Sequence, residues 1–173
     1  MAEGARKIVE LQRRIVSSPK PVVVRLDGPV RAGGIGIVAA ADIAVAGPDA
    51  TFALTEVRLG LAAAVISLSV FHRMSSRAGS RAVLTGETFD AVAAADWGLV
   101  TEVAEDLDAA VDRVLTDLRK GHPQGLRESK RVVNAELLEK LERRGEEMAE
   151  LSARLFGSDE AREAMLAFLS RKK

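Results

Sequence analysis

The first third of the chain alternates short apolar runs with proline- and glycine-rich turns. Residues 3–17 place apolar side chains at helical spacing among Arg and Lys, which predicts an amphipathic helix. Two prolines then end that helix, and the β-branched run at 21–26 is typical of a buried strand. Small residues at 32–41 predict a closely packed helix, and 42–46 a second buried strand. This order of strand, turn, helix and strand is a βαβ unit, which predicts a parallel sheet.

The middle of the chain predicts shorter elements. Ser75 and Ser76 are placed to cap the second of two short helices, and Asp90 is placed to cap the helix that follows it. In chain order we expect a strand at 51–53, two helices within 65–83, a turn at 85–90, a helix at 91–97, a strand at 99–103 and an amphipathic helix at 107–119.

Beyond Pro123 the pattern contains no strand. Charged helices carry apolar positions at helical spacing to the end of the chain, with a break at 157–159. The sequence therefore predicts an α/β part at 1–120 and a helical segment at 121–173. The apolar positions of that segment need a partner surface, either the chain's own core or another subunit.

Composition narrows the possible functions. The 173 residues include 25 basic and 25 acidic side chains, and this balance argues against nucleic acids or anionic membranes as general partners. The absence of cysteine excludes disulfides, thiolate catalysis and iron–sulfur clusters. The only histidines, His72 and His122, stand apart and predict no metal site. No segment resembles a secretory signal or a membrane span, so we expect a cytoplasmic protein without membrane or nucleic-acid partners.

Two places could carry chemistry. Gly33 and Gly34 lie where a strand gives way to a helix, so their backbone N–H groups could stabilise an anion. Tight packing of the helix on the sheet explains the same glycines, and on spacing alone it is the commoner explanation. Glu56 follows a short strand beside an apolar segment, where burial could raise its pKa and suit it to proton transfer. The alternative is a surface glutamate paired with Arg58.

A series of motifs, in order and along most of the chain, resembles the enoyl-CoA hydratase/isomerase (crotonase) family. The matching segments are PKPVVV (19–24), DG (27–28), AGG (32–34), DIAVA (42–46), ATFA (50–53), EVRLGL (56–61), LTGE (84–87), AAADWGLV (93–100) and SDEAREAMLAF (158–168).

This resemblance implies a fold and a reaction. The fold would be a crotonase-type ββα spiral, an α/β core incomplete at its N-terminus, with a C-terminal helical segment that assembles trimers or hexamers. The reaction would add water to a 2-enoyl-CoA through a thioester enolate. By the resemblance, the Gly33 N–H holds the thioester oxygen with Gly34 beside it, Glu56 is the acid/base catalyst, and Arg171 approaches the CoA phosphates. The partner is an acyl-CoA thioester; CoA is part of the substrate, and no metal or redox cofactor is implied.

The chain also departs from the family pattern. Hydratases of the family usually carry a second glutamate, and Gly36 stands in its place. Ala32 replaces a glycine, and Ala63 stands where a proline is common. With Glu56 as the only matching carboxylate, the pattern resembles a bacterial subgroup called methylglutaconyl-CoA hydratase-like.

The region that supplies the first oxyanion N–H in the family would precede residue 1. An enolate held by one N–H instead of two should lose about 3 kcal/mol of stabilisation. Two alternatives therefore stay open beside hydration. One is enoyl-CoA double-bond isomerisation, which needs a single carboxylate, and the other is a catalytically impaired acyl-CoA-binding member of the family.

Overall fold

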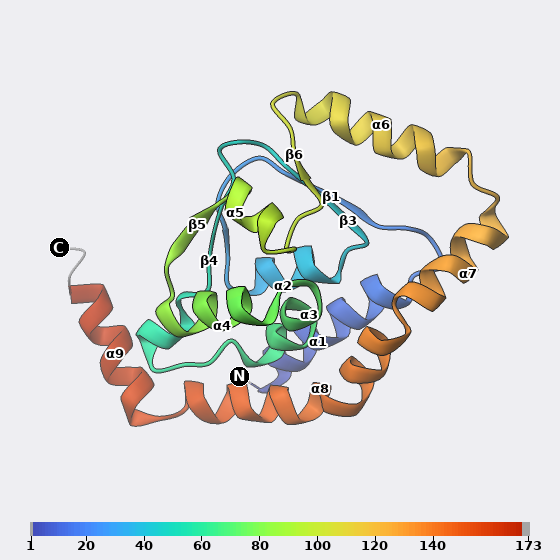
Figure 1. Cartoon of the computed structure of the whole chain (residues 1–173). Coiled ribbons are helices and arrows are strands. Elements are labelled where there is room, and N and C mark those ends of the chain that lie inside the picture. The colour runs from blue at the N-terminus through green and yellow to red at the C-terminus, as the bar shows by residue number, and fades with distance from the viewer. Residues whose placement is uncertain (1, 171–173) are drawn as a thin grey trace.

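The computed structural model describes residues 2–170 (Figure 1). Its helices are α1 (Ala2–Ser17), α2 (Gly33–Ala40), α3 (Ala64–Arg73), α4 (Ser76–Thr85), α5 (Ala91–Asp96), α6 (Leu107–Arg119), α7 (Pro123–Val133), α8 (Ala135–Phe156) and α9 (Asp159–Ser170), with a 3₁₀ helix η1 (Thr55–Leu59). Its strands are β1 (Val23–Leu26), β2 (Val30–Arg31), β3 (Ile43–Ala46), β4 (Thr51–Ala53), β5 (Thr88–Asp90) and β6 (Glu102–Val103). This mixed α/β fold, mostly helical with small sheets, is the predicted class.

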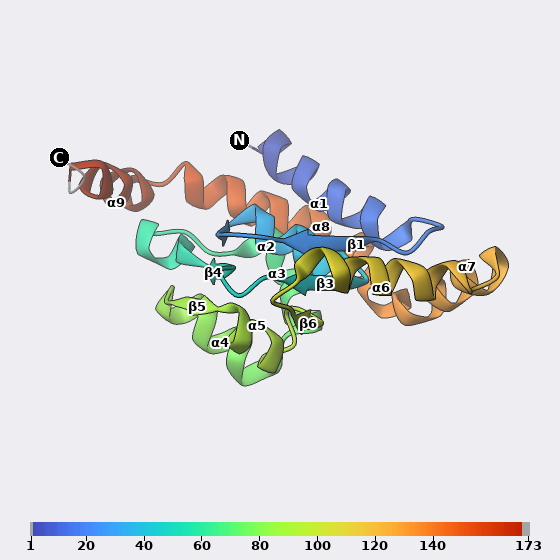
Figure 2. The same ribbon diagram turned by 90° about the horizontal axis from the view of Figure 1, so that it is seen from above.

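The strands form two small sheets. In the first, β1, β3 and β6 lie in that order, with β1 and β3 parallel from Val23 opposite Ile43 to Leu26 opposite Ala46. The predicted βαβ unit is therefore confirmed, with α2 between these two strands in the chain. In the second sheet, β4 pairs with β2 in parallel and with β5 in antiparallel orientation. Figure 2 shows α1 and α8 on one side of the strands and α4 on the other.

The predicted turn at 85–90 is partly wrong, because Thr88–Asp90 forms strand β5 against β4. Phe89 is buried there, and its ring stacks on that of Phe52 with 5.5 Å between centroids. One apolar residue among three is too short a pattern to indicate a strand, so only the contact with β4 defines it. The short strand β2 was missed for the same reason, and the strand expected at 99–103 is confined to Glu102–Val103.

The predicted helix caps have different outcomes. Asp90 caps α5 as expected, because its carboxylate accepts a hydrogen bond from the Ala93 N–H at 2.8 Å. Ser75 occupies the N-cap position of α4, but its side chain makes no capping hydrogen bond, so that prediction is wrong. The break expected at 157–159 is confirmed between α8 and α9.

Helix α8 packs back on the N-terminal part of the chain. Its inward side chains share a buried apolar cluster with α1, α2 and α3, and α1 runs along α8 (Figure 1). The cluster contains Val16, Ala40, Ala64, Leu68, Leu137, Leu141 and Met148. The chain's own core therefore covers this face of the helical segment. The division at residue 120 stays a prediction.

A buried polar network joins the start of α8 to the core. We call Asp42, Arg73, Lys130 and Asn134 the Asp42–Lys130 network. The Lys130 ammonium lies 2.8 Å from the Asp42 carboxylate and donates hydrogen bonds to two backbone carbonyls near the end of α1. Asn134 donates to Asp42 at 2.7 Å and accepts from Arg73 at 3.2 Å. These bonds hold the α7–α8 junction against the beginning of β3.

Candidate functional site

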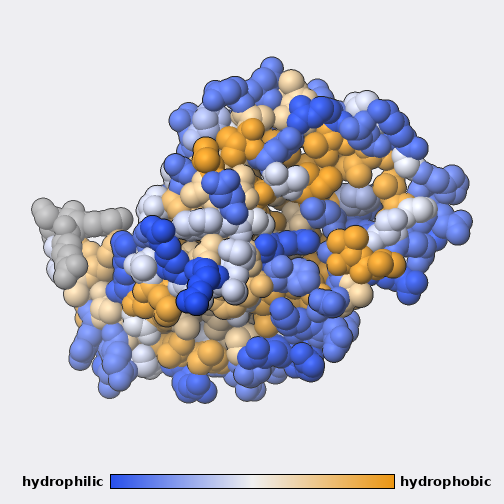
Figure 3. Space-filling view, viewed as in Figure 1, coloured by the Kyte–Doolittle hydropathy of each residue, from blue (hydrophilic) through white to orange (hydrophobic). Residues whose placement is uncertain are grey.

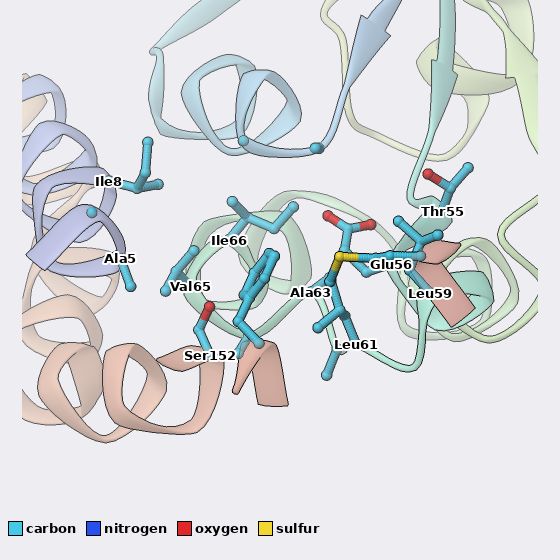
Figure 4. A pocket seen from close by; sticks show the side chains of 17 residues that line it. Ala5, Ile8, Thr55, Glu56, Leu59, Leu61, Ala63, Val65, Ile66 and Ser152 are labelled. Atoms are coloured by element: carbon cyan, nitrogen blue, oxygen red, sulfur yellow. The ribbon is translucent and has the colours of Figure 1, made fainter. Parts of the chain in front are cut away.

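A cavity of about 490 Å³ lies between α1, the start of α2, η1, the beginning of α3 and the last two helices (Figure 4). Most of its lining side chains are aliphatic or aromatic. The polar side chains on the lining are those of Thr55, Glu56 and Ser152. A mostly apolar hollow with a few polar groups is the usual form of a small-molecule site.

Glu56 lies on this cavity because the chain turns into η1 directly after β4. Gly60 ends η1 with a φ of 68°, and its Cα approaches the backbone of α9 so closely that a Cβ there would lie 3.3 Å from Ala161 atoms. Glycine therefore suits this position on both counts. The turn directs the Glu56 carboxylate into the cavity (Figure 4).

Glu56 is half-buried, and its carboxylate is incompletely bonded. Its Oε2 atom has no hydrogen-bond partner among the residues that the structure describes. Burial raises the pKa of Glu56 above its ordinary value, and a hydrogen bond from its own backbone opposes this rise. Arg58 instead donates to the Thr85 carbonyl at 3.4 Å, so the alternative of a Glu56–Arg58 surface pair is not seen. A partly desolvated carboxylate with a free oxygen is suited to accept and return a proton.

Gly33 is the first residue of α2 and lines the same cavity. The first N–H groups of a helix have no acceptor within it, and here the first closing bond runs from Ile35 N to Ala32 O at 3.0 Å. The Gly33 N–H therefore has no acceptor within α2. Gly34 does not line the cavity; a Cβ at Gly34 would lie 3.2 Å from Val30, so this glycine allows close packing. The roles of both glycines stay predictions.

Ala32, the residue before this helix, has a strained backbone. Its φ of 49° with ψ of −126° is a conformation that residues with a side chain rarely adopt. Strain of this kind costs on the order of 1–3 kcal/mol and is concentrated at ligand sites. The replacement of glycine by Ala32 is therefore costly at this turn.

Gly36, at the position of the missing second glutamate, leaves no room for a side chain. A Cβ there would lie 2.5 Å from Ile66 Cγ2 and 3.4 Å from the Gln12 side-chain oxygen. Gln12 is fully buried and accepts a hydrogen bond from Ser69 at 2.6 Å, and Ser69 lies within reach of the Gly36 carbonyl. Within residues 2–170, Glu56 is therefore the one carboxylate on the cavity lining.

Several lining residues escaped the sequence analysis. Ala5 and Ile8 come from α1, Ser152 and Phe156 from α8, and Met165 from α9. The one signal for Ser152 is a serine on the apolar face of an amphipathic helix, which by itself indicates nothing about a cavity. Residue 171, the predicted contact of the CoA phosphates, lies outside the described residues.

Comparison with known proteins relates the chain to one family. The family model described as enoyl-CoA hydratase/isomerase matches residues 2–173. A cyclohexa-1,5-dienecarbonyl-CoA hydratase of Thauera aromatica is 27% identical over 173 residues, which are 99% of this chain and 67% of that protein. A trans-2-decenoyl-[acyl-carrier-protein] isomerase of Streptococcus mutans is 32% identical over 136 residues, 77% of this chain and 51% of that protein.

Solved structures show the same fold at higher identity. The crystal structure of an enoyl-CoA hydratase from Mycobacterium avium superposes with a TM-score of 0.97 at 55% identity, covering 98% of this chain and 68% of that one. The chain thus spans about half to two thirds of the length of these relatives.

Proposed function

Because the chain belongs to the enoyl-CoA hydratase/isomerase family, we propose that its cavity catalyses hydration of a 2-enoyl-CoA thioester. The observation that carries the proposal is the Glu56 carboxylate, which lines the cavity on which α2 begins and has one buried oxygen without a hydrogen-bond partner in the described residues. Addition of water to a thioester-activated double bond needs a group that transfers a proton and an N–H group that donates a hydrogen bond to the oxyanion. Both are most effective on a surface with little water.

In the proposed reaction Glu56 first accepts a proton and then returns it, while the Gly33 N–H stabilises the enolate formed between these two steps. Glu56 takes a proton from a bound water while the water oxygen bonds to C3 of the enoyl group. The electrons of the double bond move onto the thioester oxygen, where the Gly33 N–H stabilises the enolate. Glu56 then returns its proton to C2, which leaves a 3-hydroxyacyl-CoA and regenerates the carboxylate. One carboxylate suffices, because the proton it accepts is the proton it delivers.

Double-bond isomerisation is the second candidate. It also needs one carboxylate to carry a proton between two carbons, and the filled space at Gly36 favours a single-carboxylate reaction. The relative from Streptococcus mutans named as an isomerase belongs to the same family as the hydratases. A catalytically impaired acyl-CoA-binding protein remains the alternative outside catalysis.

Replacing Glu56 by glutamine tests the proposal. Glu56→Gln keeps the shape of the side chain and removes the base, so hydration of crotonyl-CoA should fall by about 10²- to 10⁴-fold. The loss of the conjugated thioester absorbance and the mass of the 3-hydroxyacyl product report hydration. Incubation with a 3-enoyl-CoA separates the two reactions, because an isomerase forms the 2-enoyl isomer without a gain of water.

The matched control is Glu146→Gln, an exposed glutamate of α8 that pairs with Arg6 and lies away from the cavity. This variant should hydrate crotonyl-CoA at the parent rate. A Glu56→Gln rate within twofold of the parent would show that Glu56 is not the catalyst. Parent turnover equal to buffer, together with binding of the thioester, would favour the non-catalytic alternative.

Assembly and location are proposals of the same kind. Trimers or hexamers are supported by exposed apolar side chains on α7 and α9, namely Val132, Val133, Leu166 and Leu169. Figure 3 also shows apolar patches among the charged groups on the face seen in Figure 1. None of the helices within 2–170 has the length and apolar character needed to cross a membrane. A cytoplasmic location stays a prediction.

A further inference from the structure

Ser152 brings a hydroxyl group to an otherwise apolar wall of the cavity. The residue lies on α8, is 8% exposed and lines the cavity. Its side-chain oxygen points into the cavity, and it lies on the far side from Thr55 (Figure 4). Ser152 is therefore placed to touch a bound acyl chain away from Glu56, so it is suited to select substrates and not to carry the reacting proton.

Within the described residues the Ser152 hydroxyl shows no hydrogen bond to the protein, and Glu56 Oε2 is the one fully enclosed side-chain atom without a partner, so the Ser152 oxygen is open to the cavity. Other helical serines are bonded differently. Ser67, Ser80 and Ser170 each donate to a backbone carbonyl three or four residues earlier, at 2.7 to 2.9 Å. A hydrocarbon chain that displaced water from this hydroxyl would leave it unpaired, which is unfavourable, whereas a ligand oxygen would restore its hydrogen bond.

We propose that Ser152 makes the cavity selective for acyl chains that carry a neutral oxygen, a hydroxyl or a ketone, toward the end remote from the thioester. This inference rests on the proposed function, since it assumes that an acyl-CoA thioester fills the cavity. A plain hydrocarbon chain would leave the hydroxyl unpaired, whereas an oxygen at that point satisfies it.

The charges on the cavity lining favour an acyl chain with a neutral oxygen over one with a carboxylate. No lysine, arginine or histidine lines the cavity within residues 2–170, and Glu56 is the one ionisable side chain on it. A carboxylate at the end of the acyl chain would be desolvated without a cation and would lie in the same hollow as Glu56. A hydroxyl or ketone avoids both costs.

Binding of matched saturated thioesters tests this selectivity without turnover. Hexanoyl-CoA and its isomers hydroxylated at the fourth, fifth or sixth carbon are titrated into the parent, Ser152→Ala and Ser152→Thr by calorimetry. Ser152→Ala should weaken binding of at least one hydroxy isomer by about three- to tenfold and leave hexanoyl-CoA within twofold. Ser152→Thr keeps the hydroxyl and should retain the preference.

Ser67→Ala is the control, because that partly buried hydroxyl is already bonded to the Ala64 carbonyl and does not line this cavity. It should leave both affinities unchanged. The inference is overturned if Ser152→Ala weakens all thioesters equally, if it changes none, or if the parent binds none of them.

The outcomes also separate this inference from the proposed function. A Ser152-dependent preference in a protein that hydrates no enoyl-CoA would refute the proposed reaction and leave the selectivity standing. Hydration that depends on Glu56, without any preference that depends on Ser152, would refute the selectivity alone.

Discussion

The chain buries polar groups in two regions, and it treats them in opposite ways. In the Asp42–Lys130 network the Lys130 ammonium has a carboxylate and two carbonyls as partners, and Asn134 is bonded on both sides. On the cavity, Glu56 Oε2 is buried without a partner in the described part of the chain, and the Ser152 hydroxyl opens onto the same lining. Since buried polar groups need hydrogen bonds, the first region stabilises the fold, whereas the second leaves polar atoms available to a ligand.

The largest expected loss of stability is in the bonded region. Lys130→Met leaves the Asp42 carboxylate without its cation, and removing one partner of a buried pair costs about 3–5 kcal/mol. The free energy of unfolding in urea measures this loss. The control is Lys120→Met, because Lys120 pairs with Asp117 at 2.6 Å but is 72% exposed, so little change is expected. Equal losses in both variants would remove the distinction between this network and a surface pair.

The strain beside the cavity predicts a smaller effect of opposite sign. Ala32→Gly relieves a backbone cost of about 1–3 kcal/mol and adds about 0.5–1 kcal/mol of unfolded-state entropy, so stability should rise by about 1 kcal/mol. Ala109→Gly, at an exposed position inside α6, should instead lower stability by about 0.5–1 kcal/mol. Thermal unfolding of the two variants shows the signs; a loss in both would mean that Ala32 is not strained.

The smallest effect is a pH dependence at Glu56. Burial raises the pKa of Glu56 above its ordinary value of 4.5, so the folded state favours the neutral acid. The stabilising contribution is fully present below pH 4.5 and is lost as the pH rises through the raised pKa. Glu56→Gln stays neutral, so its stability relative to the parent should increase across that window.

The contribution of Glu146 to stability should depend on pH with the opposite sign. The hydrogen bond from Arg6 lowers the pKa of Glu146, so its contribution is present above its ordinary pKa and is lost as the pH falls through the lowered value. Unfolding in urea at a series of pH values compares Glu56→Gln and Glu146→Gln. Parallel profiles for the two variants would contradict a desolvated Glu56.

Local patterns predicted most helices and the βαβ unit, because periodicity and turn residues act within a few positions of the chain. Strand β5 differs, since Phe89 becomes part of a strand only through its pairing with Phe52. The candidate site divides in the same way. Glu56 and Gly33 were found because family motifs mark them. Ser152 lies 96 residues after Glu56, and nothing near it in the sequence indicates that it lines the same cavity.

By itself, the sequence determined the helical spacing of α1 and α8, the pair of glycines at the start of α2, and the absence of a second carboxylate at Gly36. Only the tertiary structure decided that Lys130 is paired and that Ser152 is not. Both are polar residues on charged helices, and each depends on what packs against it: backbone carbonyls more than 100 residues away for Lys130, and an open cavity for Ser152. Burial and hydrogen bonding are properties of such contacts, and these exist only after the helices close on the core.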